Sequence, residues 1–496
     1  MMSGHLYAKG KMCIVMSGLP GRGKTNRSER IKRYMNWLGV KARVFHLADY
    51  RRAMLGPGFK LTLEYHLNNS PDSPREHVKT ECVNDIMQFY ADGGEVAIYD
   101  AINGTIAERN SIRDILSSKD IQCLFVESLV TDAAVLARNI SEVGVTSPDY
   151  IGRNSKESFE HYVKYIESLM EHYEPITEEG LQCIKLVNDG EQCVVNNGPL
   201  GYLLNRVLMF LLNSRRRSGS LFFARAGAVE FQDSNFNGDL DLSPRGQMYA
   251  ATLSNTVMGY VSSKQIDRMD YKMDLAKLKT VADHRSLVFA SAAPSAVQSV
   301  VPSVVPSRQH SRQGSRSHSR SGSRRQSLSN EPPLLIWTST RRRSEQTSKP
   351  LRDAGVPVIS KSLLSQLNPG DAAPYIHNKA ALMEHFPSEY EAYLKDQYHY
   401  RFPRGESYQD VAVRLEPIMM EIERTQTNLL VICQESVLKV LYGYIMGLTS
   451  EEIPNLEFPY DQIVEVMPHG YSNLVVHIPL AGVAPDGGVD LPRFTN

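Results

Sequence analysis

One segment near the amino terminus constrains the fold more than any other feature. It fits the pattern G-x-x-x-x-G-K-[ST] and consists of Gly18, Leu19, Pro20, Gly21, Arg22, Gly23, Lys24 and Thr25. The glycines of such a loop let backbone N–H groups face phosphate oxygens, the lysine reaches the β- and γ-phosphates, and the threonine hydroxyl ligates Mg²⁺. The segment therefore predicts a phosphate cradle of the P-loop type, placed between a strand and a helix.

The surrounding sequence supplies that context. Buried strands are predicted by short apolar runs at 11–17, 42–47, 95–100 and 122–128. Between the first two runs, residues 25–38 carry apolar side chains at i, i+3, i+4 and i+7, and Gly39 follows, which predicts a helix and its end. A strand, a helix and a strand at this spacing predict a parallel α/β sheet.

A second α/β block begins near residue 220. Its predicted elements are strands at 221–224, 334–337 and 429–433 and a helix at 436–446. Because 496 residues exceed what one core usually supports, we expect two domains, at 11–217 and 218–496. The second is interrupted at about 290–332 by a Ser/Arg-rich segment, which we expect to be disordered because it has too little apolar surface to bury.

Composition narrows the partners and the compartment. Lys plus Arg and Asp plus Glu both number 55, so no bulk charge draws the chain to nucleic acid or to an anionic membrane. Six cysteines without a C-x-x-C pair indicate core residues in a reducing compartment. No apolar run approaches the roughly 18 residues of a membrane span. We expect a cytoplasmic protein with neither a membrane nor a nucleic-acid partner; a homodimer stays open.

Three side chains near the cradle are candidates for chemistry. Asp100 ends the third predicted strand, at the sheet edge where ligands bind, and a carboxylate there holds Mg²⁺ or takes the proton of an attacking hydroxyl. Arg52 and Arg109 follow strands, in expected loops where guanidinium groups grip a phosphorylated acceptor. Each arginine taken singly is more often a solvated surface charge.

Together these residues resemble the bifunctional 6-phosphofructo-2-kinase/fructose-2,6-bisphosphatase family, in its fungal-type form. The segments that carry the resemblance run in the family's order, at 18–25, 50–52, 96–101, 125–128, 147–150, 405–410 and 414–417. The resemblance implies an α/β protein in which an adenylate-kinase-like P-loop domain precedes a histidine-phosphatase-like domain related to phosphoglycerate mutases. It also implies ATP and Mg²⁺ as cofactors and fructose 6-phosphate as the acceptor.

The resemblance assigns roles to matching positions. Lys24 and Thr25 would serve the nucleotide and Mg²⁺, Asp100 the metal or the acceptor proton, and Arg52 the sugar phosphate. Asn139 begins a stretch that matches a nucleotide-site segment, and Lys79 stands for a substrate arginine.

The acceptor half departs from the family at four further positions. The family's lysine, threonine, arginine and tyrosine are replaced by Gly144, Ile102, Tyr165 and Leu169. Three functions therefore stay open: a fructose-6-phosphate 2-kinase, an ATP-binding pseudoenzyme with a regulatory role, and a kinase with a changed sugar-phosphate acceptor.

The second domain lacks the residues of its chemistry. The family's R-H-G-E motif stands here as Arg225-Ala226-Gly227-Ala228, and its second histidine as Gln434. An alanine methyl cannot accept a phosphoryl group, so we expect no bisphosphatase activity. The arginines at the family's anion-binding positions remain, as Arg225, Arg343 and Arg401.

The Ser/Arg-rich segment contains one candidate for modification. Arg324-Arg325-Gln326-Ser327 fits the R-R-x-S pattern that basophilic protein kinases favour, so Ser327 is a candidate phosphorylation site. The segment has no interleaved aromatic residues, and an RNA-binding function ranks below regulation.

Overall fold

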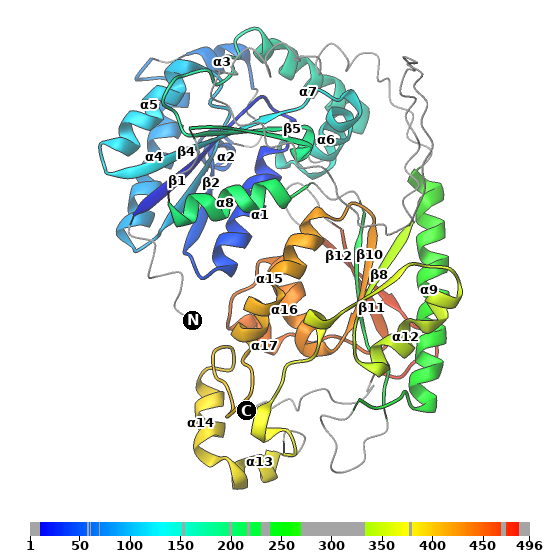
Figure 1. The fold of residues 1–496 in the computed structure, drawn as a ribbon. Helices are drawn as coiled ribbons and strands as arrows, with labels where there is room; N and C mark the ends of the chain where they lie inside the picture. The colour runs from blue at the N-terminus through cyan, green and yellow to red at the C-terminus, as the bar shows by residue number, and fades with distance from the viewer. Residues whose placement is uncertain are drawn as a thin grey trace, which may run out of the picture.

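The computed structural model describes most of the chain in two α/β halves. The described residues are 10–56, 59, 61–68, 70–150, 154–197, 201–215, 219–229, 239–268, 333–375, 379–467 and 473–485. Each half contains a six-stranded sheet with helices on both faces (Figure 1). The Ser/Arg-rich insertion expected at 290–332, Ser327 included, lies outside the described residues.

The first sheet has the strand order β2-β3-β1-β4-β5-β6. Its strands are β1 (Lys11–Ser17), β2 (Ala42–His46), β3 (Val96–Asp100), β4 (Ile121–Leu129), β5 (Cys183–Val187) and β6 (Gln192–Asn196). Neighbouring strands are parallel except β6, which is antiparallel to β5. The four strands expected from the sequence are present, with ends that shift by no more than one residue.

Helices cover both faces of this sheet. They are α1 (Lys24–Trp37), α2 (Leu47–Leu55), α3 (Leu63–Leu67), α4 (Pro74–Ala91), α5 (Ile106–Ser117), α6 (Ala133–Thr146), α7 (Ser155–Met170) and α8 (Tyr202–Asn213), with a 3₁₀ turn at Pro148–Tyr150. The helix expected at 25–38 is α1, and Gly39 follows its end with a positive φ of 78°, which a glycine adopts without strain.

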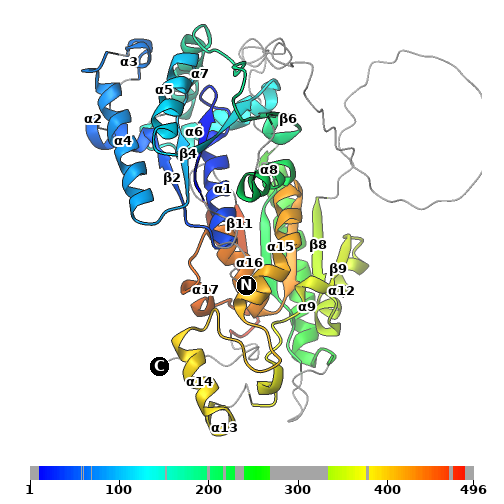
Figure 2. The same ribbon diagram turned by 60° about the vertical axis from the view of Figure 1, so that its left-hand side comes forward.

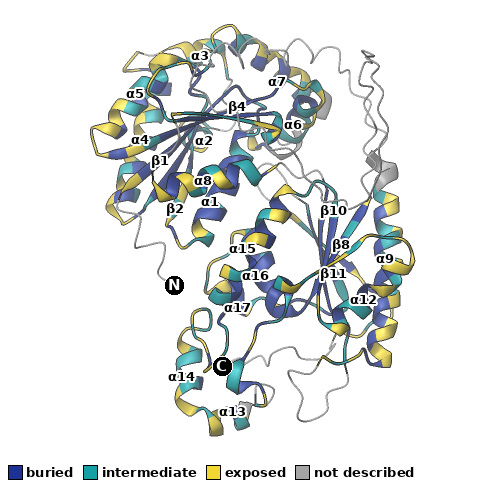
Figure 3. Cartoon of the chain, in the orientation of Figure 1, coloured by how far each residue is buried: buried dark blue, intermediate teal, exposed yellow. Residues whose placement is uncertain are grey.

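Side chains of the central strand β1 alternate between two apolar layers. Met12, Ile14 and Met16 pack with α1 and α8 on one face of the sheet, and Cys13 and Val15 pack with α4 and α5 on the other. A strand that is covered on both faces consists of apolar residues without a polar alternation, which is the pattern of this run in the sequence. Figure 3 shows the resulting buried layer along the sheet.

The second sheet has the strand order β12-β11-β7-β10-β8-β9. Its strands are β7 (Leu221–Arg225), β8 (Leu334–Ser339), β9 (Val358–Lys361), β10 (Asn428–Cys433), β11 (Gln462–Met467) and β12 (Leu474–Pro479). β11 is antiparallel to both β7 and β12, and the other pairs are parallel.

The helices of this half fall into three groups. They are α9 (Pro244–Arg268) and α12 (Arg342–Asp353) on one face, α15 (Tyr408–Arg424), α16 (Glu435–Met446) and α17 (Glu452–Asn455) on the other, and α13 (Lys379–His385) with α14 (Pro387–Lys395) beyond the end of the sheet. The turned view in Figure 2 shows α13 and α14 as a separate extension. No helix in the described part of the chain is long and apolar enough to cross a membrane.

The two halves meet through helices. Figure 1 shows α1 and α8 of the first half beside α15 and α16 of the second. Trp37 at the end of α1 lies edge-on against Tyr444 of α16, with ring centroids 5.3 Å apart. Tyr34 of α1 donates to Glu416 of α15 over 3.1 Å, and Arg206 of α8 forms an ion pair with the same carboxylate. The helix that follows the phosphate cradle is therefore also an interface helix.

Candidate active site

The phosphate cradle is the turn between β1 and α1. Gly18 has a φ of 135°, and a Cβ atom at this position would lie 2.5 Å from the carbonyl oxygen of Ser128. Only glycine fits both the backbone angle and the close approach to β4. Two side chains hold the loop: Ser128 donates to the Arg22 carbonyl over 2.7 Å, and Asn139 donates to the Gly21 carbonyl over 3.0 Å.

Lys24 begins α1 and is 8% exposed. Its Nζ donates to the carbonyl oxygens of Gly18 and Leu19 over 2.7 and 2.8 Å, so the amine lies over the loop. Burial lowers the pKa of Lys24 to about 8, with Asp100 opposing the shift and Arg22 adding to it. An amine held over the cradle is placed to make charge-assisted hydrogen bonds to phosphate oxygens.

Asp100 ends β3 and receives two hydrogen bonds on one oxygen. Thr25 Oγ1 and His46 Nδ1 both lie 2.8 Å from Asp100 Oδ2. His46 Nε2 lies 3.0 Å from Glu29 Oε1. Burial opposes protonation of His46, but the hydrogen bonds to Asp100 and Glu29 outweigh it and raise the pKa of His46 to about 10. The sequence analysis identified Thr25 and Asp100 and did not identify His46.

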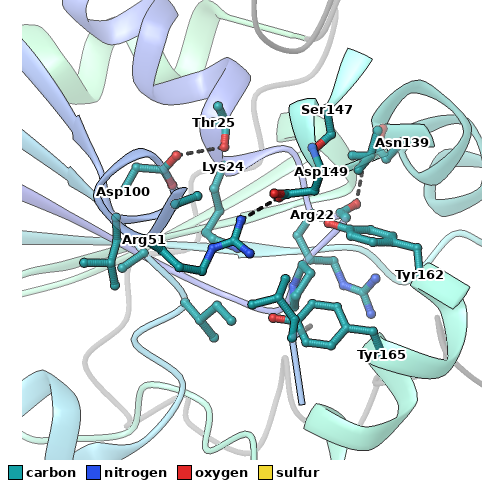
Figure 4. Close-up of a pocket in the computed structure, with 18 of the residues that line it drawn as sticks. Arg22, Lys24, Thr25, Arg51, Asp100, Asn139, Ser147, Asp149, Tyr162 and Tyr165 are labelled. Carbon is teal, nitrogen blue, oxygen red and sulfur yellow. Dashed lines mark hydrogen bonds and ion pairs between the residues drawn. The ribbon is translucent and has the colours of Figure 1, made fainter. Parts of the chain in front are cut away.

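A cavity of about 210 Å³ adjoins the cradle (Figure 4). Residues 20–26 of the cradle line it, together with Asn139 and Asp100. The same cavity is lined by residues from α2, α3, α4 and α7 and by Leu61 before α3, namely Arg51, Leu61, Tyr65, His66, Arg75, Tyr162 and Tyr165. Residues of the cradle and residues of α2, α3, α4 and α7 therefore line one cavity.

Arg51, and not Arg52, lines this cavity. Both belong to α2 and not to the loop that we expected, and both bind Asp149, over 2.6 and 3.0 Å. Arg52 also donates from Nη2 to Asp49 Oδ1 over 2.5 Å. Arg51 is 4% exposed, and its Nη1 has no hydrogen-bond partner among the residues that the structure describes. A buried guanidinium nitrogen without a partner at a cavity wall is a candidate anion-binding group.

Lys79 was expected to contact the acceptor, and the structure places it outside the cavity wall. Its Nζ lies 2.6 Å from Glu76 and 3.9 Å from Glu108. Arg75, one helical turn earlier in α4, lines the cavity instead. It donates to the His66 carbonyl over 2.6 Å and forms an ion pair with Glu108.

Arg109 was expected in a loop at the acceptor site, and this expectation is wrong. Arg109 lies in α5, is fully buried, and bonds Glu178 over 2.6 Å. It also donates to the carbonyl oxygens of Asn103 and Glu174 over 3.2 and 2.8 Å. All these partners belong to neighbouring loops, so Arg109 stabilises these loops.

The positions that depart from the family form an apolar and aromatic wall. Ile102, Tyr165 and Leu169 pack together with Leu19 of the cradle. Tyr165 Oη lies 2.6 Å from His66 Nε2. Burial, with the charges of nearby cations, lowers the pKa of His66 to about 3, so this ring is neutral at neutral pH. Gly144 belongs to α6 and follows Val143, which lines the cavity.

The corresponding site of the second half lies at the ends of β7 and β10. Arg225 ends β7, Ala226 is buried beside it, and Gln434 precedes α16. Arg225 forms a 3.5 Å ion pair with Glu435 and lies over the Tyr460 ring, 5.7 Å from its centroid. The structure therefore has a methyl group at the position where the resemblance implies a histidine.

The remaining second-site residues differ in exposure. Gln434 is 1% exposed, and neither polar atom of its side chain has a partner in the described residues. Arg343 lies in α12 and is half-buried. Arg401 is exposed and bound to Asp410 over 2.8 Å, so it has a carboxylate partner in place of the expected anion. By the resemblance, Tyr375 and Ile376 stand where the family has an acidic pair; Tyr375 stacks on His385, and Ile376 lies outside the described residues.

Two family profiles match parts of the chain. The profile of the family described as 6-phosphofructo-2-kinase matches residues 1–218. The profile described as histidine phosphatase superfamily (branch 1) matches residues 315–479.

Relatives of the whole chain were found as well. A Saccharomyces cerevisiae protein, provisionally named a 6-phosphofructo-2-kinase/fructose-2,6-bisphosphatase, is 33% identical over 96% of this chain and 85% of its own length. The Rattus norvegicus 6-phosphofructo-2-kinase/fructose-2,6-bisphosphatase 4 is 29% identical over 97% of this chain and 87% of its own. Among solved structures, an alpha-ribazole phosphatase from Shigella flexneri covers 52% of this chain and 96% of its own at 16% identity, with a TM-score of only 0.32.

Proposed function

Because this chain belongs to the 6-phosphofructo-2-kinase/fructose-2,6-bisphosphatase family, we propose that it phosphorylates the 2-hydroxyl of fructose 6-phosphate at the expense of ATP. One structural observation supports the proposal in addition to the family relationship. A single cavity joins the phosphate cradle, the carboxylate of Asp100 and the buried guanidinium of Arg51. Phosphoryl transfer depends mainly on positioning and on electrostatic stabilisation, and these three features supply both.

The nucleotide would lie at the cradle end. Backbone N–H groups of residues 18–25 and the amine of Lys24 would hold its phosphates, and Asn139 keeps the loop in shape through the Gly21 carbonyl. Lys24 would release its two loop carbonyls to bind the β- and γ-phosphates.

The residues at the cradle fit a magnesium ion. Thr25 and Asp100 offer oxygen ligands of the kind that Mg²⁺ prefers, and the Thr25 proton already goes to Asp100, which frees the hydroxyl lone pairs. Bound there with ATP, Mg²⁺ would neutralise charge on the β- and γ-phosphates. Asp100 serves either as its ligand or as the acceptor of the hydroxyl proton.

The sugar phosphate would lie on Arg51. Its unpartnered Nη1 offers a charge-assisted hydrogen bond, and Asp149 fixes the guanidinium from the other side. Arg75 adds a second cation to the lining of the same cavity. In the reaction the sugar 2-oxygen bonds to the γ-phosphorus, the bond from that phosphorus to the bridging oxygen breaks, and ADP leaves.

We infer that the second domain, which we place at 218–496, does not hydrolyse fructose 2,6-bisphosphate. The inference is supported by Ala226 and Gln434, which stand where the family uses imidazoles. Arg225 alone can bind an anion without accepting a phosphoryl group.

The kinase proposal is tested with purified protein, Mg-ATP and fructose 6-phosphate, with Lys24→Met as the blank. We expect acid-labile fructose 2,6-bisphosphate in proportion to the ADP released. Product no higher than in the Lys24→Met sample would overturn the proposal. For the second domain, hydrolysis of added fructose 2,6-bisphosphate above that of an Arg225→Ala variant would show that the domain is active.

A second candidate function is a kinase with a different sugar-phosphate acceptor. It is favoured by the wall of Ile102, Tyr165 and Leu169, which offers fewer polar groups to the acceptor than the family positions do. It predicts ATP consumption that depends on another sugar phosphate and is absent with fructose 6-phosphate.

A further inference from the structure

His46 contacts Asp100, which lines the cavity, although His46 itself does not line it. It is the last residue of β2 and is paired in register with Asp100, the last residue of β3. Parallel strands end at the same sheet edge, so the imidazole lies directly beside the Asp100 carboxylate. The 2.8 Å contact from Nδ1 to Asp100 Oδ2 is therefore a product of the sheet register.

The other nitrogen of His46 ties this carboxylate to the cradle helix. Nε2 lies 3.0 Å from Glu29, which stands one helical turn after Thr25 on α1. Thr25 donates to the same Oδ2 that His46 contacts. Asp100 is thus linked to α1 twice, once directly through Thr25 and once through His46 and Glu29.

This arrangement fixes the orientation of the Asp100 carboxylate. Two donors converge on Oδ2, which leaves Oδ1 for the cavity that Asp100 lines. Carboxylates accept and never donate when ionised, so His46 is the donor to both of its carboxylate partners. Hydrogen bonds to a metal ligand from its outer shell orient that ligand, and losing one typically costs about tenfold to a hundredfold in metal affinity or activity.

We propose that His46 is a positioning residue that sets Asp100 for Mg-ATP. It acts through its Nδ1 contact, with Glu29 holding the ring in place. The proposal rests on the proposed kinase function for its role in turnover, but its effect on Mg-ATP binding requires no sugar acceptor.

Three substitutions separate the two ring contacts. His46→Asn places an amide N–H where Nδ1 donates to Asp100, His46→Gln places one nearer to Nε2 and Glu29, and His46→Ala removes both. The matched control is His77→Ala, because His77 is an exposed histidine of α4 without a role at the site. Thermal unfolding of each variant shows whether it is folded.

The readout is ATP affinity measured by calorimetry with and without Mg²⁺. In the wild type and His77→Ala we expect Mg²⁺ to tighten ATP binding. In His46→Ala and His46→Gln this gain falls by about tenfold to a hundredfold, the usual cost of losing an outer-shell partner of a metal ligand. In His46→Asn it stays within about threefold of wild type, since the bond to Asp100 is kept. ATP affinity without Mg²⁺ stays unchanged in all variants.

Several results would overturn the proposal: an unchanged Mg²⁺ gain in His46→Ala, a wild type without such a gain, or His46→Gln performing as well as His46→Asn. If His46→Ala does not fold, the comparison of Asn with Gln still decides. Absence of fructose 2,6-bisphosphate synthesis by the wild type, with the binding pattern intact, would refute the proposed function and leave the role of His46 standing.

Discussion

Glu423 of α15 accepts hydrogen bonds from the guanidinium of Arg30, on the helix that begins at Lys24; the Arg30 Nε contact is 2.9 Å. Tyr444 donates to the other oxygen of Glu423 over 2.9 Å, and Arg33 lies 3.7 Å from that oxygen. The side chains of Arg30 and Glu423 are each only 7% exposed. A buried ion pair thus joins the cradle helix to the second domain.

Glu423→Ala should destabilise the protein by about 3 to 5 kcal/mol, because it leaves buried guanidinium groups without their carboxylate. Urea unfolding monitored by circular dichroism measures the change. The control is Glu421→Ala on the same helix, where the carboxylate is 52% exposed and pairs with Lys361. We expect the control to cost less than about 1 kcal/mol. Equal effects of the two substitutions would contradict a special role for Glu423.

The Glu423 carboxylate should also make the stability of the folded protein depend on pH. Burial by itself would raise the pKa of Glu423, but Arg30 and Arg33 outweigh it and hold the pKa below its usual value. The folded protein then binds fewer protons here than the unfolded chain, so this contribution to stability is complete above about pH 4.3 and is lost as the pH falls toward the folded pKa. The stability difference between wild type and Glu423→Gln should stay constant from about pH 6 to pH 5 and narrow as the pH falls below about 4.3. A difference that widens on acidification would show the opposite sign.

Arg51→Met should raise the KM for fructose 6-phosphate by roughly ten- to a hundredfold, because a charge-assisted hydrogen bond to phosphate contributes about 1.5 to 3 kcal/mol. Lys79→Met should change that KM by no more than about threefold, since Lys79 is held by Glu76 outside the cavity. Steady-state kinetics at saturating ATP distinguish the two. A larger effect from Lys79 than from Arg51 would restore the expectation drawn from the sequence.

Arg109→Met should lower stability and leave substrate affinity unchanged. It removes a buried guanidinium from Glu178 and from loop carbonyls, at a cost of about 3 kcal/mol. Arg113→Met, four residues later on α5 and more exposed, is the control and should cost less than about 0.5 kcal/mol. The measurements are urea unfolding and the KM for fructose 6-phosphate; a raised KM in a variant of normal stability would return Arg109 to the site.

The sequence predicted the parts of the molecule that local rules decide. The cradle, β1 and α1 follow from a motif with its own backbone requirements and from apolar spacing, and the structure confirms their placement. The order of a kinase domain and a histidine-phosphatase domain is confirmed by the family profiles. The half-exposed strands β6, β9 and β12 had no comparable apolar signal, and the sequence analysis did not place them.

The acceptor residues were less predictable because they depend on helix rotation and depth. Arg51 and Arg52 are adjacent in sequence, but successive helical residues point about 100° apart, so only the packing of α2 decides which one lines the cavity. Arg75 and Lys79 share a face of α4 one turn apart, and their distance from the cavity decides between them. His46 and Glu423 act through partners that are remote in sequence, and no local pattern identifies such pairs.

The fate of the product tests most directly the proposed kinase activity and the proposed lack of bisphosphatase activity. Purified protein is incubated with Mg-ATP and fructose 6-phosphate, fructose 2,6-bisphosphate and ADP are followed over time, and ATP is then removed with glucose and hexokinase. A kinase with a second domain that lacks bisphosphatase activity predicts one product per ADP and a level that stays constant after ATP is gone. No product above the Lys24→Met blank, or a product that decays once ATP is removed while remaining stable in protein-free buffer, would contradict it.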